Sequence, residues 1–380
     1  MLTLQRAQLT FATGIAVLAA GTFMAANAMA ASTVKIGLSV PLTGVQAGLG
    51  KEAESVWRAF AKHANSKQLA GAYTFELAVL DDAFDSAKSK ANAEQLLGQG
   101  VAVMVGTAGI PPVQIVLPLL EARKVPLLGP GSGSLALRGK SPALFHVKAS
   151  FGAEVDQMAR LLSTMGLKKV VVITDDASDR KALVERFAAA LAGAGNGGGS
   201  SVKAVVIAQQ GGATQEAVAQ AMEAQPEAVY VMTIPGLAGG VLKQLRGKNY
   251  KGFLAAWSVA ATGSVVEELG SAGAGIIFGT VMPSPTSALS GIKASFRAFA
   301  NEQGVKPSYR AMEIYITGRI LAEALARADG SSATGSKVWT ALESLRDVSI
   351  DGWRVRYLPT DRDGSKFVDT MMLMADGKFR

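Results

Sequence analysis

The sequence contains no cysteine and only two histidines, His63 and His146, in 380 residues. The absence of cysteine excludes disulfide bonds, thiolate zinc sites, cysteine nucleophiles and lipid anchors that are attached to cysteine. Two histidines are too few for most histidine-rich metal centres. His63 is expected on the solvent face of a helix and His146 in a strand. We therefore predict no metal site and no cofactor.

Long basic runs and long hydrophobic runs are also missing. The formal net charge is +8, from 38 Lys and Arg and 30 Asp and Glu. No five of these basic residues are consecutive, and aromatic residues are not interleaved with them, so we predict no binding to nucleic acid or to a membrane surface. After residue 30 no segment reaches about 18 uninterrupted apolar residues, the length typical of a membrane span.

The first 30 residues have the pattern of a secretory signal peptide. Arg6 is their only charge, an apolar stretch follows from Leu9 to Met24, and Ala28-Met29-Ala30 is a typical cleavage sequence. We expect cleavage after Ala30 and a mature protein in the periplasm. The alternative is an uncleaved anchor.

The rest of the chain alternates between strand and helix patterns, in two runs. Strict alternation predicts an α/β protein, with two lobes built on doubly wound parallel sheets and helices on both faces of each sheet. The first run has strands at 34–40, 74–80, 101–105 and 125–128 and helices at 51–64, 86–97 and from Pro111. The second has helices at 151–165 and 179–192, strands at 169–174, 202–208, 228–232, 252–256 and 275–281, and further helices between those strands.

The pattern changes after Pro283-Ser284-Pro285. Helices are expected at 291–303, 308–328 and 337–345 with no strand between them, and strands at 353–357 and 367–374. We expect this strand-poor block to return to the first lobe and cover it.

Motifs for catalysis are absent or lie in the wrong context. No G-x-S-x-G sequence is present. Gly193-x-Gly195-x-x-Gly198 resembles a dinucleotide fingerprint, but a helix precedes it and a strand follows, the reverse of the required order. Asp81-Asp82 and Asp175-Asp176 each end a strand and could hold a metal, although capping the next helix is the commoner use. We predict that the protein is not an enzyme.

Ligands of open α/β sheets bind beyond the carboxyl ends of the strands. In the first run these ends are rich in Gly and Ser, whose exposed backbone N–H groups suit a carboxylate. In the second run they offer the apolar side chains of Ile234 and Trp257. This combination favours a small organic acid as the ligand.

Several motifs, in order along nearly the whole mature chain, resemble the leucine/isoleucine/valine-binding family of type I periplasmic solute-binding proteins, which serve ABC importers. They are VKIGLSVPLTG (34–44), LDDAFD (80–85), VGTAGIPP (105–112), VPLLGPGSGSLALRG (125–139), VVITDDA (171–177), VMPSP (281–285), PSYRAMEIYITGRILAEAL (307–325) and WRVRY with DGSKFVD (353–369).

The resemblance implies a monomer with two lobes joined by crossing hinge strands, which closes on a small-molecule solute and passes it to ABC permease subunits in the inner membrane. It divides the chain into a signal peptide (1–30), lobe one (32–149 plus 283–347) and lobe two (150–282 plus 348–380).

The resemblance also implies a set of ligand-binding positions. Ile110, after Gly109, stands where the family has a hydroxyl, while the loop with Ser132, Gly133 and Ser134 keeps hydroxyl and N–H donors. The family's aromatic positions in lobe two hold Ser178 and Ile234. The acid that binds an α-ammonium group falls near Trp257 or Ser258, and neither residue is acidic.

An ammonium group that is buried without a carboxylate partner costs several kcal/mol. We therefore expect an apolar or aromatic carboxylate, or a similar neutral solute, with Trp257 as a stacking face, rather than an ordinary α-amino acid. Asp175, Asp176 and Glu313 remain possible counter-charges. Two alternatives stay open: binding of branched-chain or other amino acids, and ligand sensing for a membrane receptor.

Overall fold

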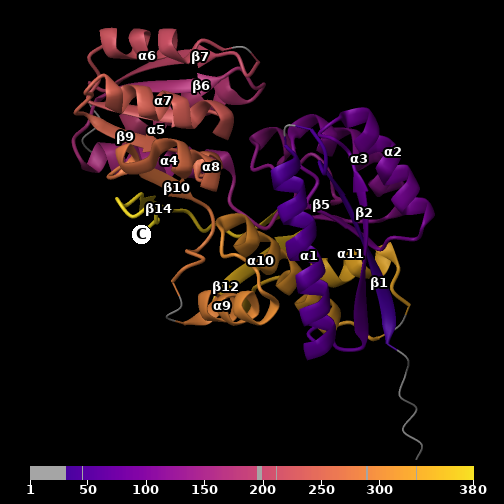
Figure 1. Ribbon diagram of the computed structural model, residues 1–380. Helices are drawn as coiled ribbons and strands as arrows, with labels where there is room; N and C mark the ends of the chain where they lie inside the picture. The colour runs from indigo at the N-terminus through magenta and orange to yellow at the C-terminus, as the bar shows by residue number, and fades with distance from the viewer. Residues whose placement is uncertain (1–30, 45, 195–198, 211, 288–289, 331) are drawn as a thin grey trace, which may run out of the picture. The chain divides into compact units, whose positions relative to one another are not determined.

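The structure is a computed structural model that describes residues 31–44, 46–194, 199–210, 212–287, 290–330 and 332–380 (Figure 1). Ala31–Arg380 forms one compact unit. The predicted signal peptide lies outside the described residues, as do Gly195 and Gly198 of the dinucleotide-like string.

The first sheet has the strand order β2-β1-β3-β4-β5, and all its neighbouring strands are parallel. Its strands are β1 (Ser32–Val40), β2 (Tyr73–Asp81), β3 (Val103–Val105), β4 (Leu127–Leu128) and β5 (Leu144–Phe145); its helices are α1 (Ala47–Lys67), α2 (Ser86–Gly98) and α3 (Ile110–Arg123), with a 3-10 turn at Leu135–Leu137. Pro111 and Pro112 stand in the first turn of α3, where a missing N–H costs nothing.

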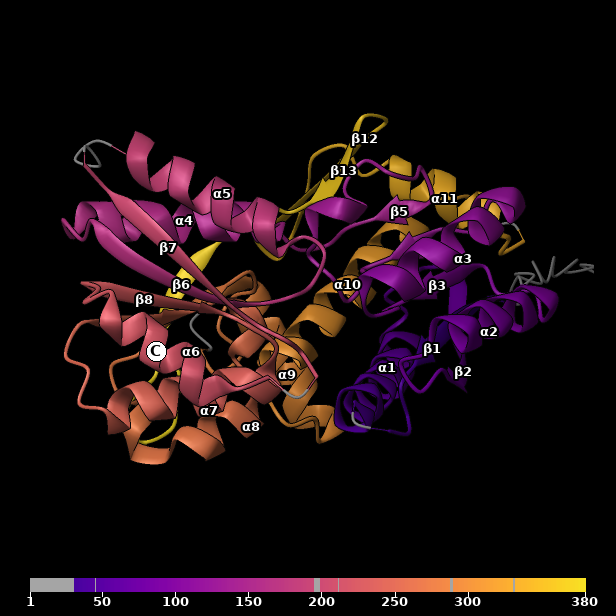
Figure 2. The same ribbon diagram turned by 90° about the horizontal axis from the view of Figure 1, so that it is seen from above.

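The second sheet has the order β14-β10-β9-β8-β6-β7 and is parallel except that β14 runs antiparallel to β10. Its strands are β6 (Lys169–Asp175), β7 (Ser201–Ile207), β8 (Ala228–Met232), β9 (Phe253–Ala256), β10 (Ile277–Thr280) and β14 (Asp369–Met372). The helices are α4 (Phe151–Thr164), α5 (Arg180–Gly193), α6 (Thr214–Glu223), α7 (Pro235–Gly247) and α8 (Gly263–Leu269), with 3-10 turns at Ser258–Ala260 and Gly270–Gly273. Figure 2 shows α4 and α5 on one face of this sheet and α6 and α7 on the other. The α/β class with two parallel sheets is thus confirmed.

The strand-poor block packs against the first sheet, as expected. It comprises α9 (Gly291–Gln303), α10 (Tyr309–Ala326) and α11 (Gly335–Glu343), followed by a small antiparallel sheet of β11 (Val348–Ile350), β12 (Trp353–Leu358) and β13 (Asp361–Gly364). α10 and α9 contact α1, far away in sequence, and Figure 1 shows these helices side by side.

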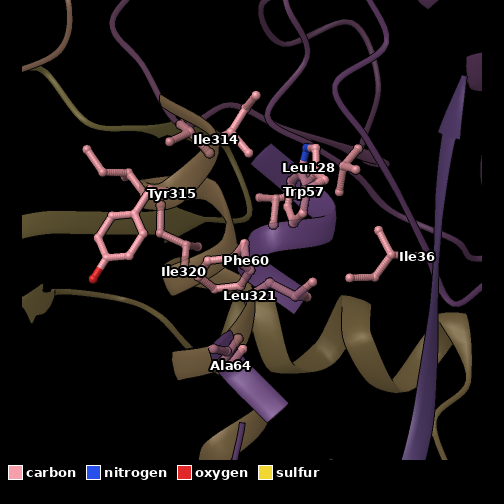
Figure 3. Packing of buried hydrophobic residues seen from close by; sticks show 14 of the residues in the cluster. Ile36, Trp57, Phe60, Ala64, Leu128, Ile314, Tyr315, Ile320 and Leu321 are labelled. Carbon is pink, nitrogen blue, oxygen red and sulfur yellow. The ribbon is translucent and has the colours of Figure 1, made fainter. Parts of the chain in front are cut away.

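The largest core cluster joins the first sheet to this block. Figure 3 shows Trp57 and Phe60 of α1 among Ile36 of β1 and Tyr315 of α10. The rings of Phe60 and Tyr315 meet edge to face with centroids 6.0 Å apart. Gly318 of α10 makes this approach possible, because a Cβ at that position would overlap the Phe60 ring.

Two expectations differ from the structure. Residues 348–380 were assigned to the second lobe, but Val348, Trp353 and Tyr357 are buried in the cluster of the first sheet, and only the segment from β14 onward packs with the second. The boundary was misplaced because β11 and β12 pair with each other rather than with either large sheet. His63 is buried rather than solvent-facing; its ring packs on Phe299 with centroids 5.3 Å apart.

Candidate functional site

The loops after β3 and β4 lie at the carboxyl end of the first sheet. Gly106, Gly109 and Gly129 have φ values of +71°, +86° and +63°, a region that favours glycine. Gly109 is the N-cap of α3, and Ile110 is the first residue of that helix. A Cβ on Gly129 would stand 2.8 Å from Cγ2 of Thr317, so α10 also lies close to this loop.

The serines predicted in the β4 loop already have partners within the protein. The Ser132 hydroxyl accepts the N–H of Ser134 (3.2 Å). Ser134 is fully buried, accepts the N–H of Ala136 (3.1 Å) and donates its hydroxyl to Oδ2 of Asp179 (2.5 Å). The carbonyl of Gly133 accepts the N–H of Phe151 (2.8 Å). This loop is therefore bonded both to the start of α4 and to the segment that begins α5.

The Trp257 ring is completely buried. Its indole N–H donates to the carbonyl of Thr233 (2.8 Å), its ring centroid lies 4.9 Å from that of Phe151, and the guanidinium carbon of Arg180 stands 4.3 Å from the ring centroid. A ligand could stack on this ring only after Arg180 moved aside.

The other predicted residues of the second sheet are spread along its carboxyl edge. Ile234 is the N-cap of α7, and its N–H donates to Oδ2 of Asp175 (2.9 Å). Ser178 is exposed in the loop after β6. Ser258 begins the 3-10 turn after β9 and donates both its N–H and its hydroxyl to Glu154. Asp175 and Arg180 thus link the N–H of Ile234 to the ring of Trp257, the neighbour of Ser258.

Arg180 pairs with both buried acids at this edge, so the three side chains together carry one net negative charge. Its Nε lies 2.9 Å from Oδ1 of Asp175, and Nη1 lies 2.6 Å from Oδ1 of Asp179. Asp175 is completely buried, and it also accepts the N–H of Ala177. Asp176 is exposed and accepts the N–H of Gln209 (3.1 Å). The carboxylate of Asp175 therefore already has hydrogen-bond partners and shares the charge of Arg180 with Asp179.

Glu154 is an acid that the sequence did not indicate. It stands in the first turn of α4, is 1% exposed, and both of its carboxylate oxygens are hydrogen-bonded by Ser258. Burial raises the pKa of Glu154 from its ordinary 4.5 to about 7, although the hydrogen bonds from Ser258 oppose this shift. A Cβ on Gly279 of β10 would overlap this carboxylate, so it lies against the sheet. Because 104 residues separate it from Ser258, no spacing pattern could have paired them.

The Asp81-Asp82 pair, considered above as a helix cap or a metal site, makes other contacts. The hydroxyl of Thr43, which donates to Asp81 (2.5 Å), lowers the pKa of Asp81 to about 2, and Asp81 also accepts the N–H of Leu42. Asp85 rather than Asp82 caps α2. The expected helix capping is therefore wrong for Asp81-Asp82. Among the residues that the structure describes, no group of three His, Asp or Glu is placed to hold a metal ion.

Glu313, the third possible counter-charge, lies at the first sheet. Nζ of Lys148 stands 2.9 Å from its Oε1 and also donates to the carbonyl of Gly131 (3.2 Å). Glu313 borders a small cavity together with Arg310 and Trp57 and with the glycines of the β3 and β4 loops. His146 is buried near this region, and burial lowers its pKa well below the ordinary value.

Comparison with known proteins gives a match over nearly the whole described chain. The family model for "periplasmic binding protein" matches residues 33–375. Curated relatives include Leu/Ile/Val-binding protein homolog 6 of Brucella abortus (strain 2308) and of Brucella suis biovar 1, each 30% identical over 156 residues. That segment covers 40% of this chain and 39% of each relative, so the alignment spans about two fifths of their length.

Solved structures share the fold. A leucine-binding protein from Thermotoga maritima has a TM-score of 0.79 at 20% identity, with 91% of this chain and 97% of the other covered. An extracellular ligand-binding receptor from Verminephrobacter eiseniae has a TM-score of 0.85 at 18% identity, covering 92% and 100%. A solute-binding protein from R. palustris, solved in complex with benzoate, has a TM-score of 0.77 at 18% identity, covering 92% and 95%. No described helix is long and apolar enough to cross a membrane.

Proposed function

Because the chain belongs to the periplasmic binding protein family, whose members bind solutes rather than catalyse reactions, we propose that it is the substrate-binding component of an ABC importer. It captures a small organic carboxylate in a cleft between two lobes, and delivers this solute to permease subunits in the inner membrane. It acts as a monomer in the periplasm after loss of residues 1–30. Hinge closure around a solute is a known type of transition for such proteins.

The observation that favours a carboxylate over an amino acid as the ligand is that the buried acids already have partners within the protein. Asp175 and Asp179 share Arg180, and Glu154 is buried and held by Ser258. Each of these three carboxylates already has a partner in the protein, so a ligand ammonium group would have to compete with Arg180 or Ser258 for it. A buried ammonium group without such a partner would lose several kcal/mol of binding free energy.

The site that we propose combines the predicted residues of both sheets. Glycine-rich loops with backbone donors face a carboxylate on one side, and apolar side chains face the rest of the solute on the other. The benzoate held by the R. palustris protein supports this choice, because it places an aromatic carboxylate in the same fold. The proposed ligand-binding residues are Gly109, Ile110, Ser132, Gly133, Ser134, Ser178, Ile234, Trp257 and Ser258.

A second candidate is a branched-chain amino acid. It is favoured by the names of the Brucella relatives and of the Thermotoga maritima structure. Under this reading Arg180 would have to release Asp175 or Asp179 when the ligand binds, so that one carboxylate becomes free for the ammonium group.

A thermal-shift screen of the purified protein separates these candidates. The panel contains aromatic acids, short branched aliphatic acids, and leucine, isoleucine and valine. A ligand at a hundredfold excess over its Kd stabilises the folded state by about 2.7 kcal/mol, which raises the melting temperature measurably. We expect the acids without an amino group to give this shift. A shift with leucine or valine, and none with the acids, would favour the second candidate and contradict the first.

A further inference from the structure

A small cavity lies where the glycine loops of the first sheet meet α1 and α10. Gly106, Gly129 and Gly131 line one part of it, and Trp57 of α1 and Arg310 of α10 line another. Its volume is about 10 Å³, enough for roughly one water-sized group. Figure 3 shows the Trp57 indole among the core side chains that include Leu128 and Ile314.

Two hydrogen-bond donors in this cavity have no acceptor among the described residues. Nε of Arg310 is buried and unpaired, and its guanidinium makes no ion pair with any described acid. Trp57 is 1% exposed, and its indole N–H likewise has no acceptor in the described part of the chain. An unpaired buried donor costs about 1–3 kcal/mol and more when charged, so Nε of Arg310 calls for a partner, and the nearby indole N–H of Trp57 is free to bind the same partner.

The acid beside them does not supply that partner. Glu313 is held by Lys148, whose Nζ lies 2.9 Å from Oε1 and 3.1 Å from Oε2. The charges of Lys148 and Glu313 cancel, so the guanidinium of Arg310 gives the lining of the cavity a net charge of +1. An oxygen of an anion would satisfy both donors and this charge together.

We propose that Arg310 and Trp57 bind one carboxylate oxygen of the solute, and that Arg310 selects organic anions over neutral or zwitterionic solutes. This inference rests on the proposed function and adds residues that the predicted site lacked. The cavity admits only about one oxygen atom of the head group, so the rest of the ligand lies outside it. A charge-assisted hydrogen bond from a guanidinium then supplies much of the affinity.

The test compares Arg310→Gln with Arg327→Gln, a matched control at the C-cap of α10 whose guanidinium is paired with Glu323. The probes are benzoate and 4-methylpentanoate, each with its primary amide, measured by calorimetry. We expect Arg310→Gln to weaken acid binding by about tenfold to a hundredfold and to abolish the preference for acid over amide. Arg327→Gln should leave both affinities unchanged. Trp57→Phe, which keeps a ring but removes the N–H, should weaken acid binding by roughly fivefold to tenfold.

The outcomes distinguish this inference from the proposed function. If the wild-type protein binds an acid and Arg310→Gln binds it within threefold of wild type, the role of Arg310 is refuted while the proposed function stands. If the wild-type protein binds only amino acids or only neutral solutes, both are refuted. Should Arg310→Gln not fold, as judged by its melting curve, the Trp57→Phe variant decides: an acid affinity within twofold of wild type overturns the inference.

Discussion

At the scale of single residues, the site contains groups that the sequence pattern could not reveal. Glu154 occupies an ordinary polar position in the first turn of a helix, yet its carboxylate meets Ser258 from the 3-10 turn after β9. Arg310 stands in a predicted helix with nothing to distinguish it from a surface arginine. Both depend on tertiary contacts, which a single sequence does not encode in its spacing.

Glu154 should make stability depend on pH. Its pKa is about 7 in the folded protein against an ordinary 4.5, so the folded state binds the proton more tightly than the unfolded state. This contribution to the free energy of unfolding is complete below about pH 4.5 and is lost as the pH rises through 7. The loss amounts to about 3 kcal/mol.

Urea unfolding at pH 5 and pH 8 measures this effect. We expect Glu154→Gln to reduce the fall in stability between these two pH values, because an amide has no proton to release. Glu185→Gln, on an exposed position of α5, serves as the control and should follow the wild-type profile. A Glu154→Gln profile parallel to that of the wild type would show that the carboxyl group is not protonated in the folded protein.

At the scale of elements, periodicity located most helices and long strands. The helix expected at 86–97 is α2 (Ser86–Gly98), and the strand expected at 228–232 is β8. β4 and β5 have only two residues each, too short for any period, and β11 and β13 were missed because they pair outside the two parallel sheets. The carboxyl-end loops were correctly located by topology, but the partners of their side chains were not.

The close approach of α10 to α1 gives a prediction at this scale. Gly318→Ala should destabilise the protein by about 1–3 kcal/mol, because the added methyl group would overlap the Phe60 ring in a packed core. Gly247→Ala, at the end of α7 with open space around its Cα, should be neutral or slightly stabilising. Chemical denaturation of both variants provides the comparison. Equal stabilities would mean that α10 can shift away from α1 at no cost.

At the scale of the whole molecule, each large core needs residues from the end of the chain. The cluster of the first sheet contains Val355 and Tyr357, and that of the second contains Met371 and Leu373. Two runs of strand–helix alternation predict two lobes. They do not predict which lobe each segment near the end of the chain joins. That choice depends on which edge strand lacks a neighbour, as β10 does until β14 pairs with it.

Adjacent residues at the last strand test this arrangement. Leu373 is fully buried, whereas Met372 is 41% exposed. Leu373→Ala should lower the free energy of unfolding by about 2–5 kcal/mol, and Met372→Ala by less than about 0.5 kcal/mol. Thermal melts of both variants give the measurement. Similar losses in the two would indicate that the end of the chain contributes little to the second core.

The late position of β14 has a consequence for biosynthesis. Without β14, the edge of β10 would expose backbone N–H and C=O groups that invite pairing with another chain. A truncated product that lacks β14 would therefore be prone to aggregate rather than merely inactive.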